Sequence, residues 1–441
     1  MDGHNKMQTE DFSTADFLTS PISLKLLPST SFINDGGELF IGDVAVTDMA
    51  AEFGTPLFIY DEENLRHNIS EAKAAFPAGV AYASKAFLCK AMAELVAEYG
   101  INMDVSSLGE MYIALGSGVP AENIVLHGNN KSVLEMKFAV ENGIKIVIDS
   151  FDEINLLHDV TSGLKKKCRA LLRVTPGVEA HTHEFVKTGH EDSKFGFPLA
   201  DSVAHRAIEQ LFRLGHVELL GLHSHIGSQI FELSPYVETM EIMAPIFNRY
   251  SFSELCIGGG LGVPYLGNEY APSVSEWAKA ALQAAEQAGI AKDVAITAEP
   301  GRSIVAATAI TCYTVGSIKE IPQVRTYLAV DGGMSDNPRP ILYGSGYEVF
   351  LPSRADAFRE KAVRVVGKHC ESGDILVSGG FIPVDTEVGE IIATPVTGAY
   401  GYSMASHYNR LLRPAVVFVR DGNPRLVCRR ESLEDLLRFD V

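Results

Sequence analysis

Between VAYASKA (residues 80–86) and VAITAEPG (residues 294–301) the chain repeats one pattern eight times. Each repeat begins with a short apolar run of strand character. The other six runs are INMDVSS (101–107), IVLHGNN (124–130), KIVIDSF (145–151), ALLRVTPG (170–177), LLGLHSHIG (219–227) and LCIGGGL (255–261). Between the runs lie stretches with helical periodicity, such as SVLEMKFAVENG (132–143). This alternation predicts an α/β fold with a (β/α)8 barrel, because the alternative, a doubly wound sheet, seldom needs eight units.

The sequence after Arg302 changes character. Alternating apolar runs interrupted by Gly and Pro, such as TAITCYTVGSI (308–318) and PAVVFVR (414–420), are typical of antiparallel β-structure. Two earlier runs, GGELFIGDVAV (36–46) and PLFIY (56–60), are expected to join this second, all-β domain, which would be a sandwich or barrel-like sheet. A length of 441 residues suits two domains. We predict a barrel over residues 61–305, a β domain from residues 31–60 and 306–441, and an N-terminal extension, residues 1–30, without an assigned function.

Composition excludes several classes of function. The formal net charge of −19 repels nucleic-acid backbones and anionic membrane surfaces. No apolar run approaches the ~20 residues of a transmembrane helix, and the beginning, MDGHNKMQTEDF, has neither a basic leader nor an apolar signal core. We therefore expect a cytoplasmic protein without nucleic-acid or membrane partners. The six cysteines form no CxxC pair, so no metal site and no disulfide framework are predicted.

Polar side chains gather at the ends of the predicted strands. In (β/α)8 barrels the catalytic groups lie at the carboxyl ends of the strands. Each such residue alone has an ordinary structural explanation, but their convergence on one rim predicts an active site. The set consists of Lys85, Asp104, Ser106, His127, Asn129, Arg173, His225, Ser228, Gly258, Gly259, Gly260, Glu299 and Arg302.

Lys85 follows the first strand, in AYASKAF. Its apolar neighbours are expected to lower its pKa and to favour the neutral amine that a Schiff base requires. Most lysines are solvated surface groups, so Lys85 alone is weak evidence.

Three consecutive glycines, Gly258, Gly259 and Gly260, follow the seventh strand. A turn without side chains lets backbone N–H groups approach a phosphate closely. A dinucleotide-binding fingerprint would require glycine at Val263, so dinucleotide binding is disfavoured. A tight structural turn is the alternative reading.

Glu299 ends the eighth strand, in AEPGR. A carboxylate there could keep the nitrogen of a pyridine ring protonated, which makes the ring a strong electron sink. The alternative is an ion pair with Arg302. In GLHSHIGSQ, His225 could stack on such a ring and Ser228 could donate to a phosphate, although a histidine on a strand is more often a core residue.

The predicted β domain contributes a second group of polar residues. In HCESGD, Cys370 could act as a general acid and Glu371 could bind an ammonium group. In DNPRPILYG, Arg339 and Tyr343 are suited to hold a carboxylate, because a guanidinium group forms bidentate hydrogen bonds with it.

Taken together, these motifs resemble those of the fold type III pyridoxal-phosphate decarboxylases, specifically the diaminopimelate decarboxylases. The resemblance runs from about Gly37 to Pro414, through YASKA, DVSSLGE, HGNNK, SKFG, GLHSHIGSQ, GGGLG, AEPGRS, VDGGMSDNPRPILYG, CESGD and TGAYGYSMAS. It implies an enzyme that uses pyridoxal 5′-phosphate to decarboxylate meso-2,6-diaminopimelate to L-lysine and CO2, the last step of lysine biosynthesis.

The same resemblance implies a role for each candidate residue. Lys85 would form the Schiff base, His225 would stack on the cofactor ring, and Glu299 would bind its nitrogen. Cys370 would be the acid and Glu371 would bind the distal ammonium of the substrate, both from the partner subunit, which implies a homodimer with shared active sites. The remaining roles are phosphate binding by Gly258, Gly259, Gly260, Ser228 and Tyr400, and substrate binding by Arg302, Arg339, Tyr343 and Tyr400.

Two positions depart from the family pattern, Phe87 and His407, where asparagine is usual. Neither carries a named role. Two other functions are weighed: decarboxylation of another amino acid, and a non-catalytic homologue that binds partners. The paired arginines argue against the first, because a diamine-forming substrate has no distal carboxylate. The presence of both Lys85 and Cys370 argues against the second.

Overall fold

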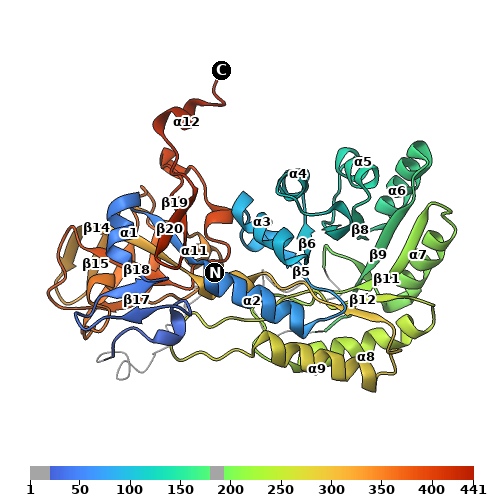
Figure 1. Ribbon diagram of the computed structural model, residues 1–441, viewed down its shortest axis with the longest axis horizontal. Helices are drawn as coiled ribbons and strands as arrows, with labels where there is room; N and C mark the ends of the chain where they lie inside the picture. Colours follow the sequence, from blue (N-terminus) through green and yellow to red (C-terminus); the bar gives the residue numbers. More distant parts are fainter. Residues whose placement is uncertain (1–19, 179–192) are drawn as a thin grey trace, which may run out of the picture.

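Eight parallel strands form a ring in the computed structural model, which describes residues 20–178 and 193–441 (Figure 1). The strands are β5 (Ala81–Ala83), β6 (Asn102–Val105), β7 (Ile124–Leu126), β8 (Lys145–Ile148), β9 (Cys168–Thr175), β11 (Val217–His223), β12 (Glu254–Cys256) and β13 (Ala295–Thr297). The ring closes where the Ala81 N–H donates to the Ala298 carbonyl at 2.8 Å. The two-residue β10 (Phe197–Pro198) pairs with β9 outside this order. The predicted (β/α)8 barrel is confirmed.

Helices alternate with these strands and cover the outside of the barrel (Figure 1). They are α2 (Glu62–Ala75), α3 (Lys90–Tyr99), α4 (Leu108–Gly116), α5 (Val133–Asn142), α6 (Phe151–Leu164), α7 (Val203–Phe212), α8 (Ser234–Asn248), α9 (Val274–Gln287) and the short α10 (Arg302–Val305). Serines begin several of them: Ser132 and Ser273 each form a capping box with the glutamate three residues later. Such boxes satisfy N–H groups that a helix start leaves without partners, so the sequence itself sets these boundaries.

The second sheet has the order β17-β16-β15-β14-β4-β19-β20, with β18 paired to β14. Its strands are β4 (Leu57–Asp61), β14 (Ala309–Ile321), β15 (Arg325–Val330), β16 (Lys361–Val366), β17 (Ile375–Ile382), β18 (Ile391–Pro395), β19 (Ala415–Arg420) and β20 (Asn423–Cys428). Two pairings, β15 with β16 and β4 with β19, are parallel. The other pairings are antiparallel, so the predicted antiparallel character of this second domain is confirmed, with two parallel exceptions. In each of the two parallel pairs a long connection joins the two strands. A short hairpin would require an antiparallel pairing, but a long connection does not.

The segment before the barrel divides between strand and helix. A small sheet contains β1 (Phe32–Ile33), β2 (Leu39–Ile41) and β3 (Val44–Ala45), and α1 (Val46–Phe53) follows directly. β4, from the predicted PLFIY strand, lies between β14 and β19 in the second sheet. The domain boundaries at 60/61 and 305/306 stay a prediction. Of the expected N-terminal extension, residues 1–19 lie outside the described part of the chain.

Phe87 lies in the contact between the two sheets. It is fully buried, and its ring stacks on Tyr60 of β4 with centroids 4.4 Å apart, close to Phe418 of β19. This aromatic packing joins the segment after β5 to the second sheet. The departure from asparagine at this position is thus compensated by a hydrophobic contact.

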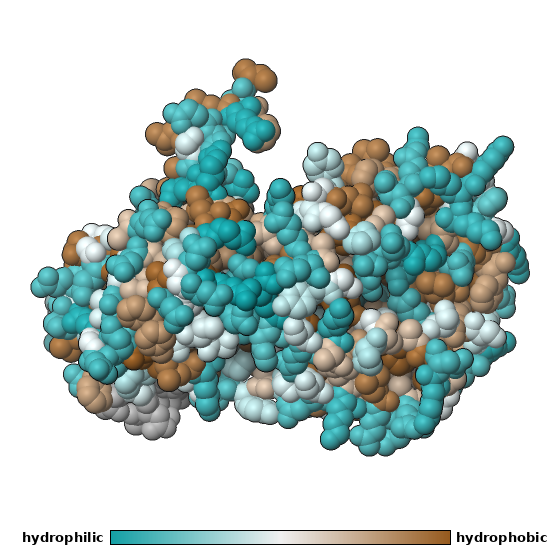
Figure 2. Space-filling model, in the orientation of Figure 1, coloured by the Kyte–Doolittle hydropathy of each residue, from teal (hydrophilic) through white to brown (hydrophobic). Residues whose placement is uncertain are grey.

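At the other end of the chain, α12 (Leu433–Leu437) stands away from the body of the molecule (Figures 1 and 2). Leu433, Leu437 and Phe439 are exposed there. Within the described ranges, no helix has the length and apolar character needed to cross a bilayer.

Candidate active site

Lys85 lies in a short 3-10 turn, Ser84–Ala86, directly after β5. Its Nζ is 3.6 Å from Oδ2 of Asp104, and 46% of its side chain is accessible. Burial acts to lower the pKa of Lys85, but Asp104, followed by Tyr400 and Glu299, outweighs it and the pKa is raised. The expectation of a lowered pKa is therefore wrong for the structure without cofactor, because the decisive neighbour is a carboxylate on the next strand and not an adjacent residue in the sequence.

Glu299 is buried after β13 and accepts hydrogen bonds at both carboxylate oxygens. Oε2 accepts from His223 Nε2 at 2.9 Å, and Oε1 accepts from Cys256 Sγ at 3.3 Å and lies 3.0 Å from His127 Nε2. Burial alone would raise the pKa of Glu299, but the two histidines hold it well below its ordinary value. The alternative ion pair with Arg302 is not formed among the described residues. Glu299 is thus a charged carboxylate held in a fixed orientation.

His127, His223 and Glu299 are also close enough together to hold a metal ion. Two histidines and one carboxylate suit a transition metal. The hydrogen bond from His223 and the close approach of His127 to Glu299 already account for the cluster, and both histidines lower the pKa of the carboxylate.

His225 follows β11, and its Nδ1 accepts a hydrogen bond from the Gly259 N–H at 3.2 Å. The pKa of His225 lies well below its ordinary value because of burial and, next, the positive charges of Lys85 and Arg173. Its ring is therefore neutral and tied to the glycine turn. A neutral flat ring in this position is suited to stacking.

The three glycines of the turn have no room for side chains. A Cβ at Gly258 would lie 2.3 Å from the Ser224 carbonyl oxygen, and one at Gly259 would lie 2.2 Å from that of Glu299. Gly260 has a φ of +102°, which L side chains rarely adopt. The turn therefore packs backbone against backbone, next to both His225 and Glu299.

Two arginines lie together beside this turn. Arg302 donates from Nη1 to the Tyr265 hydroxyl at 2.6 Å and from Nη2 to Ser228 Oγ at 2.9 Å. Arg339, which begins α11 (Arg339–Tyr343), donates from Nη1 to the same Tyr265 hydroxyl at 2.7 Å and from Nη2 to Ser345 Oγ at 2.9 Å. One phenol oxygen thus joins two guanidinium groups that come from different helices, α10 and α11.

Both guanidinium groups are buried cations that have no counter-ion among the residues the structure describes. Arg302 is 8% exposed and Arg339 is 3% exposed. In the described part of the chain neither forms an ion pair with a carboxylate, and the Nε of each is buried without a hydrogen-bond partner. Buried charge is costly unless paired, so this position favours an anionic ligand.

Tyr400 brings a loop of the second sheet to the barrel rim. Its N–H donates to the Ala86 carbonyl at 2.8 Å, next to Lys85, and its φ is +60°. The Arg302 guanidinium lies 4.8 Å from the centre of its ring. Tyr400 therefore connects the Lys85 turn with the arginine pair.

Cys370 and Glu371 are exposed. The Cys370 N–H donates to Asn409 Oδ1 at 3.0 Å, and Glu371 Oε1 accepts from the Gly373 N–H at 3.3 Å. No contact among the described residues of the chain joins either side chain to Lys85 or to the arginine pair. Nearby, His407 Nε2 lies 2.6 Å from Glu431 Oε2, so the histidine that departs from asparagine forms a hydrogen bond at the surface.

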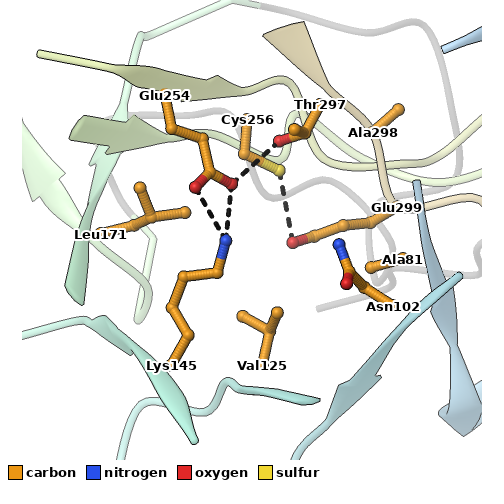
Figure 3. A pocket seen from close by; sticks show the side chains of 10 residues that line it. All are labelled: Ala81, Asn102, Val125, Lys145, Leu171, Glu254, Cys256, Thr297, Ala298 and Glu299. Atoms are coloured by element: carbon orange, nitrogen blue, oxygen red, sulfur yellow. Dashed lines mark hydrogen bonds and ion pairs between the residues drawn. The ribbon is translucent and has the colours of Figure 1, made fainter. Parts of the chain in front are cut away.

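A small cavity lies inside the barrel below Glu299 (Figure 3). Its volume is about 10 Å³, close to the room that one water molecule needs. On its wall, Lys145 points at Glu254 with Nζ and Oε1 2.7 Å apart. This ion pair belongs to the barrel interior, and the cavity is too small for a cofactor or an amino acid.

Most of the predicted residues therefore come together at one end of the barrel, and several partners were not foreseen. His223, Tyr265 and Ser345 were not named as site residues, and Asp104 and His127 had no assigned role. His223 stands two residues before His225 in a motif already quoted, which was an available signal. Tyr265 and Ser345 lie in loops without any distinguishing pattern.

The described residues suit pyridoxal phosphate. An accessible amine at Lys85 lies near a carboxylate that is held charged at Glu299, and the glycine turn beside Ser228 and His225 leaves no room for side chains. Both oxygens of the buried Asp104 also lack a hydrogen-bond partner. These are the groups needed to attach an aldehyde cofactor and to hold its ring nitrogen protonated.

Comparison with known proteins agrees with this class of site. Residues 62–306 match the family described as pyridoxal-dependent decarboxylase, pyridoxal binding domain. The chain is a pyridoxal-phosphate-dependent decarboxylase. It is 45% identical over 433 residues to a diaminopimelate decarboxylase of Bacillus subtilis, covering 94% of this chain and 98% of that one. A diaminopimelate decarboxylase of Synechocystis is 42% identical, with 94% and 92% covered.

Solved structures give the same result. A diaminopimelate decarboxylase from M. jannaschii in complex with L-lysine has a TM-score of 0.87 at 31% identity, covering 94% of this chain and 98% of that one. One from Helicobacter pylori, also with L-lysine, has a TM-score of 0.81 at 30% identity, with 89% and 98% covered. The chain belongs to the diaminopimelate decarboxylase family.

Proposed function

We propose that the protein decarboxylates meso-2,6-diaminopimelate to L-lysine and CO2, the last step of lysine biosynthesis. The observation that carries this choice of substrate is the pair of buried arginines, Arg302 and Arg339, without a carboxylate partner in the described chain. A substrate that keeps a carboxylate after decarboxylation supplies the missing charge. Ornithine and lysine offer no second carboxylate. The relatives from M. jannaschii and H. pylori are described with L-lysine bound.

The proposed roles of the cofactor-binding residues follow from their positions. Bound pyridoxal phosphate supplies an electron sink for the electron pair that remains when CO2 leaves. The amine of Lys85, near the carboxylate of Asp104, would hold the cofactor through its aldehyde group, with loss of water. Glu299 would keep the ring nitrogen protonated, and the neutral ring of His225 would support the cofactor ring. Gly258, Gly259, Gly260, Ser228 and Tyr400 hold its phosphate.

On the substrate, Arg302, Arg339 and Tyr343 bind the distal carboxylate. Glu371 binds the distal ammonium, which fixes the stereocentre that does not react. Cys370 then donates a proton to the carbon that has lost CO2. Tyr400 lies between the cofactor-binding and the substrate-binding residues, so it would contact both the cofactor and the substrate.

Substrate choice is tested with purified protein, pyridoxal phosphate and each amino acid in turn. We expect lysine and CO2 from meso-2,6-diaminopimelate, and less than about one hundredth of that rate with ornithine or lysine, since these lose a charge-assisted bidentate contact. Comparable rates on the three substrates would contradict the assignment.

We further propose a homodimer with active sites shared between subunits. Two observations support it: Cys370 and Glu371 lie on the surface without a described contact to Lys85, and α12 exposes Leu433, Leu437 and Phe439 away from the body of its own subunit (Figure 2). An exposed apolar segment of this kind marks a protein contact.

We also propose that the protein is located in the cytoplasm. The proposed acid, Cys370, must be a reduced thiol, and thiols stay reduced in the cytoplasm.

The shared site predicts that two inactive variants complement each other. Lys85→Ala and Cys370→Ala homodimers should each be nearly inactive. Random subunit exchange makes about half of the dimers hybrid, and each hybrid has one site with both mutations and one with neither. Activity should therefore recover to roughly one quarter of the wild-type value. If both groups came from one subunit, mixing would restore nothing even when exchange is confirmed by mass spectrometry of tagged subunits.

A further inference from the structure

We propose that Tyr265 is a positioning residue that holds Arg302 and Arg339 together as one receptor for the distal carboxylate. This inference rests on the proposed function. Its basis is that the Tyr265 hydroxyl accepts hydrogen bonds from the Nη1 atoms of both arginines, at 2.6 and 2.7 Å. The two arginines are 37 residues apart in the chain and begin different helices, α10 and α11, so sequence proximity does not bring them together.

The Tyr265 ring also lies against both cations. The Arg339 guanidinium is 4.6 Å and that of Arg302 is 5.9 Å from its centre. Tyr265 itself is buried, and Tyr347 packs edge-on against it with ring centroids 5.2 Å apart. The position of the phenol is therefore fixed by packing on one side and by two charged donors on the other.

A hydroxyl acceptor suits this position better than a carboxylate would. Two guanidinium groups repel each other, and a carboxylate between them would relieve the repulsion but would also neutralise the site. A phenol oxygen accepts from both groups and leaves both charges available. Ser228 and Ser345 do the same at the outer Nη2 atoms. Three hydroxyls thus orient two arginines without competing with an anionic ligand for their charge.

Replacing Tyr265 by Phe tests this role, because the ring and its cation contacts stay while the shared acceptor is lost. Each arginine loses one hydrogen bond, and the pair is free to separate. For Tyr265→Phe we expect the KM for meso-2,6-diaminopimelate to rise on the order of tenfold, as for the loss of one hydrogen bond to a charged group, while kcat stays within about twofold. The matched control is Tyr347→Phe. It removes the hydroxyl of the neighbouring ring, and this hydroxyl has no described hydrogen bond to either arginine.

The binding of two non-reacting amines to the holoenzyme shows whether Tyr265→Phe affects only the position of the arginines or damages the whole active site. L-lysine carries the carboxylate that the arginines bind, and 1,5-diaminopentane lacks it. By titration calorimetry, Tyr265→Phe should weaken L-lysine on the order of tenfold and leave 1,5-diaminopentane unchanged, with Tyr347→Phe close to wild type for both. Equal weakening of both ligands, or of neither, would overturn the inference.

The same experiment separates this inference from the proposed function. If the wild-type enzyme releases no CO2 from meso-2,6-diaminopimelate, the proposed function fails whatever the variant does. If the wild-type enzyme is active and Tyr265→Phe has wild-type KM and L-lysine affinity, the inference alone fails.

Discussion

Replacing Glu299 by Gln should slow decarboxylation without unfolding the protein. The amide has the same shape, and the histidines that contact Glu299, at 2.9 and 3.0 Å, can each donate or accept after a change of tautomer. The loss is one of charge. A hydrogen bond to a charged group contributes about 1.5–3 kcal/mol and a neutral one about 0.5–1.5 kcal/mol. The contact with the protonated ring nitrogen should therefore weaken by about 1–2 kcal/mol, or roughly 5- to 30-fold in kcat.

The pH profile of Glu299→Gln provides the sharper assay. The pKa of Glu299 lies well below its ordinary value, so in the wild type the carboxylate stays charged as the pH is lowered to about 5, and in its proposed role it keeps the ring nitrogen protonated. Without it the pKa of that nitrogen falls, and the variant should recover activity as the pH is lowered while the wild type does not. Rates are measured at saturating substrate, with cofactor content determined by absorbance. A variant with bound cofactor, wild-type kcat and an unchanged profile would refute the proposed role.

Two further predictions concern Lys85 and Asp336. Lys85→Ala should abolish borohydride fixation of the cofactor to the chain, measured as a peptide mass shift, while Lys90→Ala, on an exposed side chain, should leave fixation intact. Burial raises the pKa of Asp336 to about 7, so the folded state keeps a proton that the unfolded state releases above about pH 4, and stability falls as pH rises between these values. Asp336→Asn should therefore gain stability over the wild type by up to about 1.4 kcal/mol per pH unit in that window; a gain that is equal at pH 5 and pH 7.5 in denaturant melts would contradict this.

The barrel could be predicted because its signals are local. Each strand is a short apolar run, and serine caps such as Ser132 and Ser273 mark where helices begin. The second sheet was harder, because its pairing joins distant segments: β4 lies beside β14 and β19, more than two hundred residues later. β18 is nearly all buried, so its sequence has no alternating pattern that would mark it as a strand.

The candidate site shows the same division. Lys85, Glu299 and the glycine turn stand at strand ends and could be chosen from the sequence. The raised pKa of Lys85 could not, because it depends on Asp104 of the neighbouring strand. Tyr265 could not either, since its partner Arg339 is 74 positions away and no pattern in GVPYLG marks the tyrosine.

The distribution of charge explains how a protein with a net charge of −19 can bind a dicarboxylate. Exposed charges act only over a Debye length, about 8 Å at physiological ionic strength, so most surface carboxylates are screened from the site. Buried charges are screened much less. Around the cofactor position, the carboxylates of Asp104 and Glu299 face the cations of Lys85 and Arg173, so positive and negative charges are present there in similar number. Around Arg302 and Arg339, the hydrogen-bond partners in the described part of the chain are hydroxyls. In the proposed function, the distal carboxylate therefore binds at buried cations that have no carboxylate partner among the described residues, and this selects the substrate.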